Sequence, residues 1–370
     1  MPIRRFPIAA ATCILLASAC DDAPLNFGTG PTGYVNDRGE PCDLTPGLAP
    51  PIGYALDTLG SLAGLNPAGR LNHRSLRFAS PQRGYLLSLQ LTSGERTVVS
   101  RTDDGGVTWR RLPFPESRDP RGLACHGVDT CVVAVQTPGP ALGYVTFDGG
   151  GTWDTIGRQL GIGELTGLRY DDAGRLYATT QPYSGGRVVR SDDHGRTWHS
   201  VGERDGIRRL TFVPGSDELL FSLAEGGRFV AMDTAGGVRY ETTTPLRGAY
   251  TTDFLQAIDR DHVALSSRRT VYTSSDGGRT WRSSDERVSR LVGFETPTDA
   301  LAVTVEESCV DYDVGLTREV FAVTDDGAET WAKPAVRSTN LGGRLRTCDY
   351  LGDGAWRCVL GGAVVALRRA

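Results

Sequence analysis

Apolar residues along this chain come in short runs, separated by stretches rich in glycine, aspartate, serine and threonine. A typical run is Gly143-Tyr144-Val145, and a polar turn separates it from the next run, Trp153 to Ile156. Short apolar runs bounded by turn residues favour β-strands, and the sequence carries no long amphipathic helical pattern. The pattern therefore predicts an all-β fold that is built from many β-hairpins.

One eight-residue phrase recurs at these turns. It reads Ser/Thr-x-Asp-x-Gly-x-Thr-Trp at residues 102–109, 146–153, 191–198 and 274–281, and a fifth copy at 324–331 carries Ala328 instead of the glycine. Its aspartates are Asp104, Asp148, Asp193, Asp276 and Asp326, separated by 44, 45, 83 and 50 residues. Since 83 is close to two repeats, we expect a degenerate copy at residues 231–237. This period is typical of four-stranded propeller blades.

We interpret the five repeated aspartates as structural. An aspartate at a hairpin turn accepts hydrogen bonds from backbone N–H groups just ahead of it, and glycine supplies the positive φ that such a turn needs. The tryptophan begins the return strand and covers the turn with apolar surface. None of these roles acts on a substrate.

The phrase resembles the Asp-box, also called the bacterial neuraminidase repeat. Propellers with this repeat include sialidases, sortilin-type receptors, xyloglucan-cleaving glycosidases and a photosystem II assembly factor. The resemblance implies a propeller fold but no particular activity, because these proteins share turns rather than active sites. Sialidases typically carry a Phe/Tyr-Arg-Ile-Pro stretch before their first repeat. The part of the chain that follows the predicted signal segment has no such stretch.

A second periodic feature sets the number of blades. Each unit opens with a short strand that contains an aligned leucine or phenylalanine: Leu76, Leu123, Leu168, Leu210, Phe254, Leu291 and Leu345. Seven openings predict seven blades, with six as the alternative if the last strands only cap the ring. The seventh unit has three strands, and a strand from residues 46–72 is expected to complete it and so close the ring.

The N-terminus is typical of an export signal. Arg4 and Arg5 precede a short apolar core, and small residues precede Cys20. This segment fits both ordinary signal peptidase and a bacterial lipobox that ends at Cys20, and we favour the lipoprotein. We therefore expect a signal peptide at 1–20, a flexible tether at 21–45 and the propeller at 46–370, anchored to the bacterial cell envelope by lipid alone.

The cysteine count supports this view, because six cysteines remain once Cys13 and Cys20 are set aside. An even set suits an oxidising compartment. Repeat position suggests that Cys125 pairs with Cys131 and Cys348 with Cys358, each across the turn between the first two strands of a blade. Cys42 and Cys309 would then pair and staple the tether to an insertion in blade six. Other connectivities remain open.

Composition and motifs exclude several function classes. The net charge is −4 over 370 residues, which gives no nucleic-acid footprint for the whole chain. The sequence shows no nucleophile elbow, no zinc-protease motif, no cofactor motif and no Cys/His cluster with metal-ligand spacing. His194 and His199 both lie at the third repeat, where a surface turn is the simplest interpretation. We expect no catalytic residue, no metal and no cofactor.

One cluster points to binding. Arginines recur just before the inner strands, and we select Arg121, Arg209, Arg290 and Arg344 as ligand-binding candidates at one rim of the central channel. Several guanidinium groups around one opening attract carboxylate or sulfate groups. The sequence thus predicts a monomeric, non-catalytic binding or scaffold module for an envelope protein or glycan. The alternative is a glycoside hydrolase, sialidase-like or xyloglucanase-like.

Overall fold

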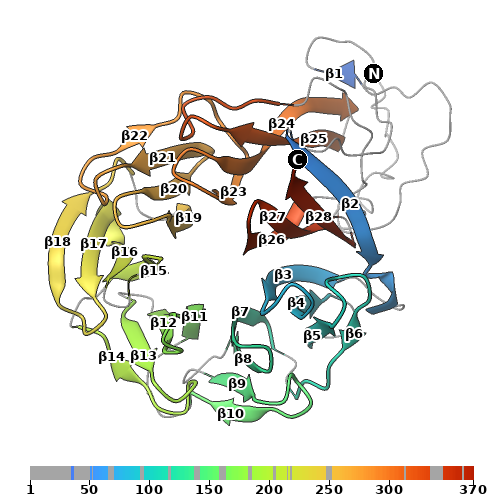
Figure 1. Cartoon of the computed structure of the whole chain (residues 1–370), viewed down its shortest axis with the longest axis vertical. Helices are drawn as coiled ribbons and strands as arrows, with labels where there is room; N and C mark the ends of the chain where they lie inside the picture. Colours follow the sequence, from blue (N-terminus) through green and yellow to red (C-terminus); the bar gives the residue numbers. More distant parts are fainter. Residues whose placement is uncertain are drawn as a thin grey trace, which may run out of the picture.

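The computed structural model is a ring of seven antiparallel sheets around a central axis (Figure 1). The structure describes residues 35–36, 51, 53–65, 71–91, 96–115, 118–136, 142–157, 164–181, 186–202, 206–214, 216, 219–246, 252–311, 314–333, 345–360 and 362–370. Each sheet has four strands, so the chain is a seven-bladed β-propeller, and the alternative of six blades is wrong. Among the described residues, no helix is long and apolar enough to cross a membrane.

The first four blades follow one another without interruption. Blade one contains β3 (Leu71–Phe78), β4 (Gly84–Gln90), β5 (Arg96–Thr102) and β6 (Arg110–Arg111). Blade two contains β7 (Pro120–His126), β8 (Thr130–Val135), β9 (Leu142–Thr146) and β10 (Asp154–Ile156). Blade three contains β11 (Glu164–Tyr170), β12 (Leu176–Gln181), β13 (Val188–Ser191) and β14 (His199–Ser200). Blade four contains β15 (Ile207–Phe212), β16 (Leu219–Ala224), β17 (Arg228–Asp233) and β18 (Val238–Thr243).

Among the last three blades, blades six and seven each contain one strand from the N-terminal part of the chain. Blade five contains β19 (Thr252–Ala257), β20 (Val263–Ser267), β21 (Thr270–Ser274) and β22 (Arg282–Ser283). Blade six contains β23 (Arg290–Phe294), β24 (Ala300–Asp311), β25 (Val314–Thr324) and the short β1 (Val35–Asn36). Blade seven contains β26 (Leu345–Gly352), β27 (Ala355–Leu360), β28 (Ala363–Arg369) and β2 (Tyr54–Ser61). Within the described ranges, two short 3-10 helices lie at Ala63–Leu65 and Glu225–Gly227.

The N-terminal strand closes the ring. β2 pairs with β28 along its whole length, from Tyr54 opposite Arg369 to Ser61 opposite Ala363. The prediction that a strand from residues 46–72 completes the seventh blade is therefore confirmed. Pairing the two ends of the chain in one sheet removes the open edge that the last blade would otherwise present.

The hydrophobic core lies between the blades. The buried apolar residues form seven clusters, and each cluster fills one interface between neighbouring sheets. Leu76, Leu123 and Leu168, which mark the starts of three predicted units, are each at most 4% exposed. Period-2 alternation lets each strand send side chains to both faces of its sheet, so every sheet packs on two neighbours.

The repeated phrase forms a hydrogen-bonded turn between the third and fourth strands of blades one, two, three and five, and in blade six it follows the third strand, β25. In the first copy the Thr108 N–H donates to Asp104 Oδ1 at 2.9 Å, and the Thr108 hydroxyl donates to Asp104 Oδ2 at 2.5 Å. The Gly106 N–H donates to Thr102 Oγ1 at 2.9 Å. The same bonds recur around Asp148, Asp193, Asp276 and Asp326.

The turn survives in a reduced form in blade four. Residues 231–237 connect β17 to β18, as predicted for the degenerate copy. Asp233 still accepts the N–H groups of Ala235 and Gly237, at 3.1 and 2.7 Å. The sequence there has neither the threonine nor the tryptophan of the intact copies.

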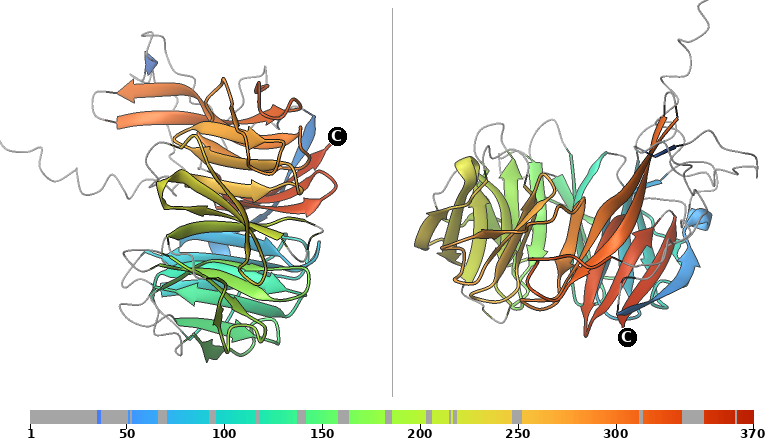
Figure 2. Two further views of the ribbon diagram at one scale, coloured as in Figure 1. Left: turned by 90° about the vertical axis from the view of Figure 1, so that its left-hand side faces the viewer. Right: turned by 90° about the horizontal axis from the view of Figure 1, so that it is seen from above.

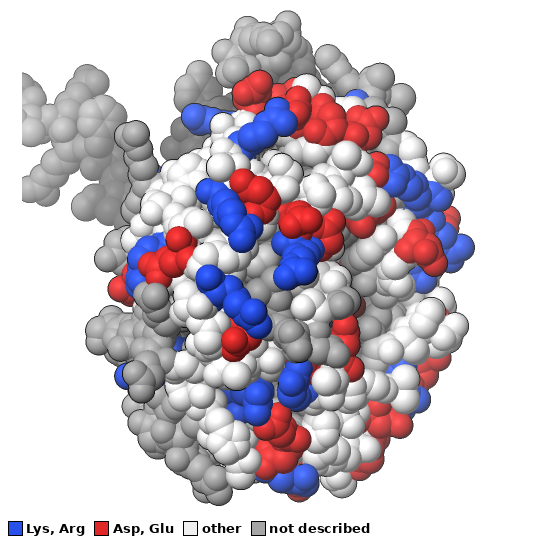
Figure 3. All heavy atoms as spheres, turned by 60° about the vertical axis from the view of Figure 1, so that its left-hand side comes forward, with Lys and Arg blue, Asp and Glu red and all other residues white. Residues whose placement is uncertain are grey.

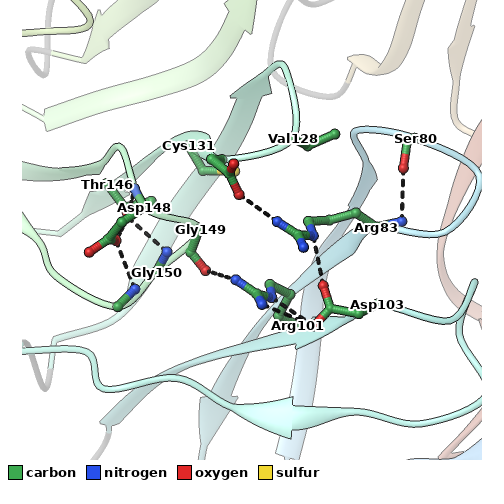
Figure 4. Close-up of polar contacts among 12 residues, drawn as sticks. Ser80, Arg83, Arg101, Asp103, Val128, Cys131, Thr146, Asp148, Gly149 and Gly150 are labelled. Carbon is green, nitrogen blue, oxygen red and sulfur yellow. Dashed lines mark hydrogen bonds and ion pairs between the residues drawn. The ribbon is translucent and has the colours of Figure 1, made fainter.

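These turns also tie neighbouring blades together. In four copies the backbone carbonyl of the first glycine of the turn accepts a hydrogen bond from a side chain of the preceding blade. The pairs are Arg357 to Gly105, Arg101 to Gly149, Tyr240 to Gly277 and Thr273 to Gly327. Figure 4 shows this joint between blades one and two, where Asp103 also bridges Arg83 and Arg101. The repeated turn is therefore both a hairpin connection and an inter-blade joint.

This geometry yields a matched pair of substitutions in one turn. Asp326 accepts the Thr330 N–H at 3.0 Å, whereas its neighbour Asp325 is exposed and makes no hydrogen bond with a described residue. By analogy with a lost helix cap, Asp326→Ala is expected to lower the free energy of unfolding by about 1 kcal/mol. Asp325→Ala is expected to change it by less than about 0.5 kcal/mol. Urea denaturation measures both, and equal losses would contradict the structural role.

Two of the predicted cysteine pairs lie at disulfide distance. Cys125 joins Cys131 across the turn between β7 and β8, and Cys348 joins Cys358 across the turn between β26 and β27. Cys20, Cys42 and the greater part of the predicted tether lie outside the described residues. β1 pairs with β24 at Cys309 and Val310, which places residues 35–36 beside blade six.

Candidate functional site

The arginines selected at the channel rim meet different surroundings. Arg121 lies 3.4 Å from Asp119 and also pairs with Glu164, so two carboxylates neutralise it. Arg290 donates to the backbone carbonyls of Leu345 and Arg346 and so joins blade six to blade seven. Arg344 lies outside the described residues.

Arg209 belongs to a different group, deeper in the channel. The charge on Arg169 of β11 lies within electrostatic range of Arg77 of β3, Arg209 of β15 and Asp349 of β26. These strands are the inner strands of blades one, three, four and seven, of which blades one and three are not neighbours. Side chains from such blades approach one another only near the axis of the ring. The structure therefore brings three arginines and one aspartate together in the central channel.

The aspartate of this group, Asp349, forms an ion pair with Arg77. Arg77 lies 3.2 Å from Asp349, which also accepts the Phe78 N–H at 2.6 Å. Burial raises the pKa of Asp349 above its usual range, against the opposing effect of Arg77. Asp349 thus fixes Arg77 in place and joins blade seven to blade one.

Arg169 is the exception in the group. Its side chain is exposed to the channel and makes no ion pair with a described residue. Burial among the inner strands, together with the smaller effect of the like charges on Arg77 and Arg209, lowers its pKa to about 10. Arg169 remains charged at neutral pH, in a place where a bound anion would relieve that cost.

Other inner strands use equivalent positions for joints between blades. Gln256 of β19 exchanges two hydrogen bonds with the Phe294 backbone, both at 2.9 Å. Thr211 of β15 accepts the Ala257 N–H at 3.2 Å. Arg169 makes no such bond among the described residues, so its side chain is available for a ligand.

Sequence reasoning missed Arg77 and Arg169 but contained a signal for them. Each directly follows the aligned leucine of its inner strand, as Leu76-Arg77 and Leu168-Arg169. The rim arginines come before that leucine. The position after the leucine supplies two of the three arginines of the channel group, and Arg209, which comes before Leu210, supplies the third. Register shifts lie between His73 and Ser75 in β3 and between Thr166 and Arg169 in β11.

The tyrosines and histidines lie elsewhere. Tyr85 and Tyr177 are buried within their blades and Tyr144 is 7% exposed, so these three tyrosines pack in the core. His194 lies in the third repeated turn with φ 60° and contacts the Tyr170 hydroxyl at 3.0 Å. Among the residues that the structure describes, no group of three His, Cys, Asp or Glu is placed to hold a metal ion.

The chain matches no family model, and no curated protein matches it. Its fold is similar to YCF48 bound to D1 peptide, with TM-score 0.62 and 15% identity over 88% of this chain and 100% of that chain. YCF48 from Cyanidioschyzon merolae gives TM-score 0.60 and 14% identity, over 85% and 98%. The GH74 xyloglucanase from Xanthomonas campestris gives 0.57 and 14%, over 85% and 53%. Such identities show a shared β-propeller fold and leave the activity open.

Proposed function

We propose that this chain is an Asp-box propeller that binds an envelope protein or glycan without catalysis, held at the bacterial cell envelope by a lipid on Cys20. The observation that carries the binding part is the group Arg77, Arg169 and Arg209 in the channel. A guanidinium group presents several N–H donors in a plane and matches a carboxylate with two parallel hydrogen bonds. A carboxylate is therefore the ligand group that this site fits best.

Three features support binding over catalysis. The acidic group beside the arginines, Asp349, is occupied by Arg77 and by a backbone N–H. Tyr85 and Tyr177, two tyrosines of the inner part of the blades, are buried in the sheets and so are not placed to attack a substrate. Finally, YCF48 is described as bound to a peptide, so in that protein a propeller of this shape binds a peptide.

A titration tests the site directly. Fluorescent glutamate-rich peptides and oligogalacturonate offer carboxylates on a protein and on a glycan. Arg169→Gln is expected to weaken whichever probe binds by about tenfold or more, because a hydrogen bond to a charged group contributes about 1.5–3 kcal/mol. The control is Arg260→Gln, which removes an exposed arginine that follows β19, outside the channel. Equal affinities for both variants would contradict the channel site.

Turnover assays address the hydrolase alternative. The parent protein is expected to leave fluorogenic sialosides and aryl glycosides uncleaved. If the parent protein cleaves a substrate and Arg169→Gln does not, the chain is an enzyme whose active site lies in the channel, and the binding-module hypothesis is wrong. Separately, palmitate labelling that is lost in Cys20→Ala would support the lipid anchor, and labelling that persists would contradict it.

A further inference from the structure

Two adjacent arginines occupy a backbone conformation that costs energy. Ser267 of β20 pairs with Thr270 of β21, so Arg268 and Arg269 form a two-residue hairpin loop. Their φ angles are 48° and 72°. A loop of this kind needs positive φ at both positions and favours Asn-Gly or Gly-Gly, because a Cβ atom is strained there.

Another hairpin of the chain carries glycines at the corresponding place in the sequence. In blade seven Leu360 pairs with Ala363 across the corresponding hairpin, and the sequence of that loop is Gly361-Gly362. The fold therefore does not require arginine at this position. Strain that persists at an exposed loop is a reason to look for a function of the side chains.

A third arginine joins the pair. The Val288 N–H donates to the Arg269 carbonyl at 2.9 Å, which places Arg287 beside the loop. Arg268, Arg269 and Arg287 are all exposed, and none makes an ion pair with a described residue. Of the acidic residues on the adjoining connection, Glu286 pairs with Lys333 at 3.3 Å, and Asp285 is exposed. These three arginines, called the hairpin patch below, form a cationic surface on a chain of net charge −4.

The hairpin patch lies on the face of the ring where β1 pairs with blade six. β20–β21 and β24–β25 are corresponding hairpins of neighbouring blades, and β1 pairs near the end of β24. Figure 2 shows β24 and β25, in orange, extending beyond the other blades on one face. The repeated turns, with Asp104, Asp148, Asp193, Asp276 and Asp326, lie at the opposite ends of the blades. On the flank seen in Figure 3, acidic and basic side chains lie interspersed. Ion pairs such as Arg228–Glu241 and Arg239–Asp233 neutralise arginines elsewhere on the chain.

We propose that the hairpin patch docks on anionic phospholipid headgroups, so that the face with the long hairpin is turned towards the membrane. Only 14 residues separate Cys20 from β1. A chain of that length spans at most about 50 Å, which holds this face near any membrane to which Cys20 is anchored. The orientation rests on the lipid anchor of the proposed function. The interaction of the patch with headgroups does not, and this allows the two to be tested apart.

The test uses the otherwise complete chain with Cys20→Ser, which removes the acylation site, and vesicles of phosphatidylcholine with or without about one-third phosphatidylglycerol. Cys20→Ser protein is expected to float with the anionic vesicles alone and to detach as salt rises. Adding Arg268→Asn and Arg269→Gly is expected to lower the partition coefficient about thirtyfold, equivalent to about 1 kcal/mol for each lost arginine.

Weaker binding by this variant would not result from unfolding. Asn-Gly suits a loop with positive φ at both positions and is expected to raise Tm by about 2 °C or more. The matched control, Arg239→Gln with Arg260→Gln, removes the same charge away from the hairpin patch and is expected to change binding by less than about twofold. The proposal is overturned if the hairpin variant binds anionic vesicles as well as its parent. It is also overturned if the parent binds neutral vesicles equally, or binds polyglutamate but no vesicles, which would assign the patch to an acidic protein.

These outcomes are independent of the channel site. Loss of palmitate labelling or of carboxylate binding would remove the proposed function and leave vesicle flotation unchanged. Conversely, failed flotation with intact labelling would refute the hairpin patch alone.

Discussion

Glu295→Ala is expected to lower the free energy of unfolding by about 3 kcal/mol, because this carboxylate holds the closure point of the ring. Its side chain is 2% exposed and follows β23 in blade six. Both the Tyr54 hydroxyl of β2 and the Trp356 indole N–H of β27 donate to Oε1, the latter at 2.5 Å. Arg369 of β28 lies 3.6 Å from Oε2. One side chain thus joins blade six to three strands of blade seven, including the N-terminal strand.

Two controls separate this joint from an ordinary ion pair. Glu295→Gln keeps an acceptor for Tyr54 and Trp356 but removes the charge, so its loss is expected to be about half as large. Glu329→Ala removes an exposed partner of Arg282 and is expected to cost less than about 1 kcal/mol. Urea denaturation gives the three values. A loss for Glu295→Ala no greater than that for Glu329→Ala would show that this joint does not hold the ring.

Between pH 7 and pH 4 the protein is expected to lose about 3 kcal/mol of stability through His73 alone. His73 is 8% exposed and contacts Ser88 Oγ through Nδ1 at 2.8 Å. Burial, with a smaller effect of the Arg346 charge, lowers its pKa to about 4. As the pH falls below about 6.5, His73 binds a proton in the unfolded chain but stays neutral in the folded chain. Stability therefore falls from about pH 6.5 and this loss is complete near pH 4.

The aspartates of the repeated turns titrate below this window. Burial would raise the pKa of Asp276, but hydrogen bonds from Thr280 outweigh it and hold the pKa at about 2, so the stability from that carboxylate is lost only at lower pH. His194 acts in the same direction as His73, because burial lowers its pKa too. His73→Asn keeps a polar contact for Ser88 without titrating. Unfolding midpoints at pH 7 and pH 4.5 are expected to converge in that variant, and an unchanged pH dependence would refute the role of His73.

The repeat made the fold predictable from sequence. Each turn is complete within eight residues, so Asp104 and Thr108 meet whatever the rest of the chain does. The spacing between copies then fixes the blade period. The two cysteine pairs were predictable for the same reason, because they are 6 and 10 residues apart and flank one hairpin each.

The candidate site was only partly predictable. Arg121, Arg209 and Arg290 occupy similar places before their inner strands, yet one pairs with carboxylates, one approaches the channel group and one binds carbonyls. Bulges in the inner strands and the neighbouring blade decide between these outcomes. Neither can be read from the spacing of arginines along the chain.

The sequence by itself determined the propeller fold and its structural turns, because every contact that defines a turn lies within a few residues, and the closed ring then decided for seven blades over six. Tertiary structure alone decided which charges meet. Tyr54 and Glu295 are 241 residues apart, and Arg77 and Asp349 are 272 apart. Closing the ring brings the two ends of the chain into one sheet and the inner strands around one axis. Burial in those places then makes Glu295 a joint and leaves Arg169 available for a ligand.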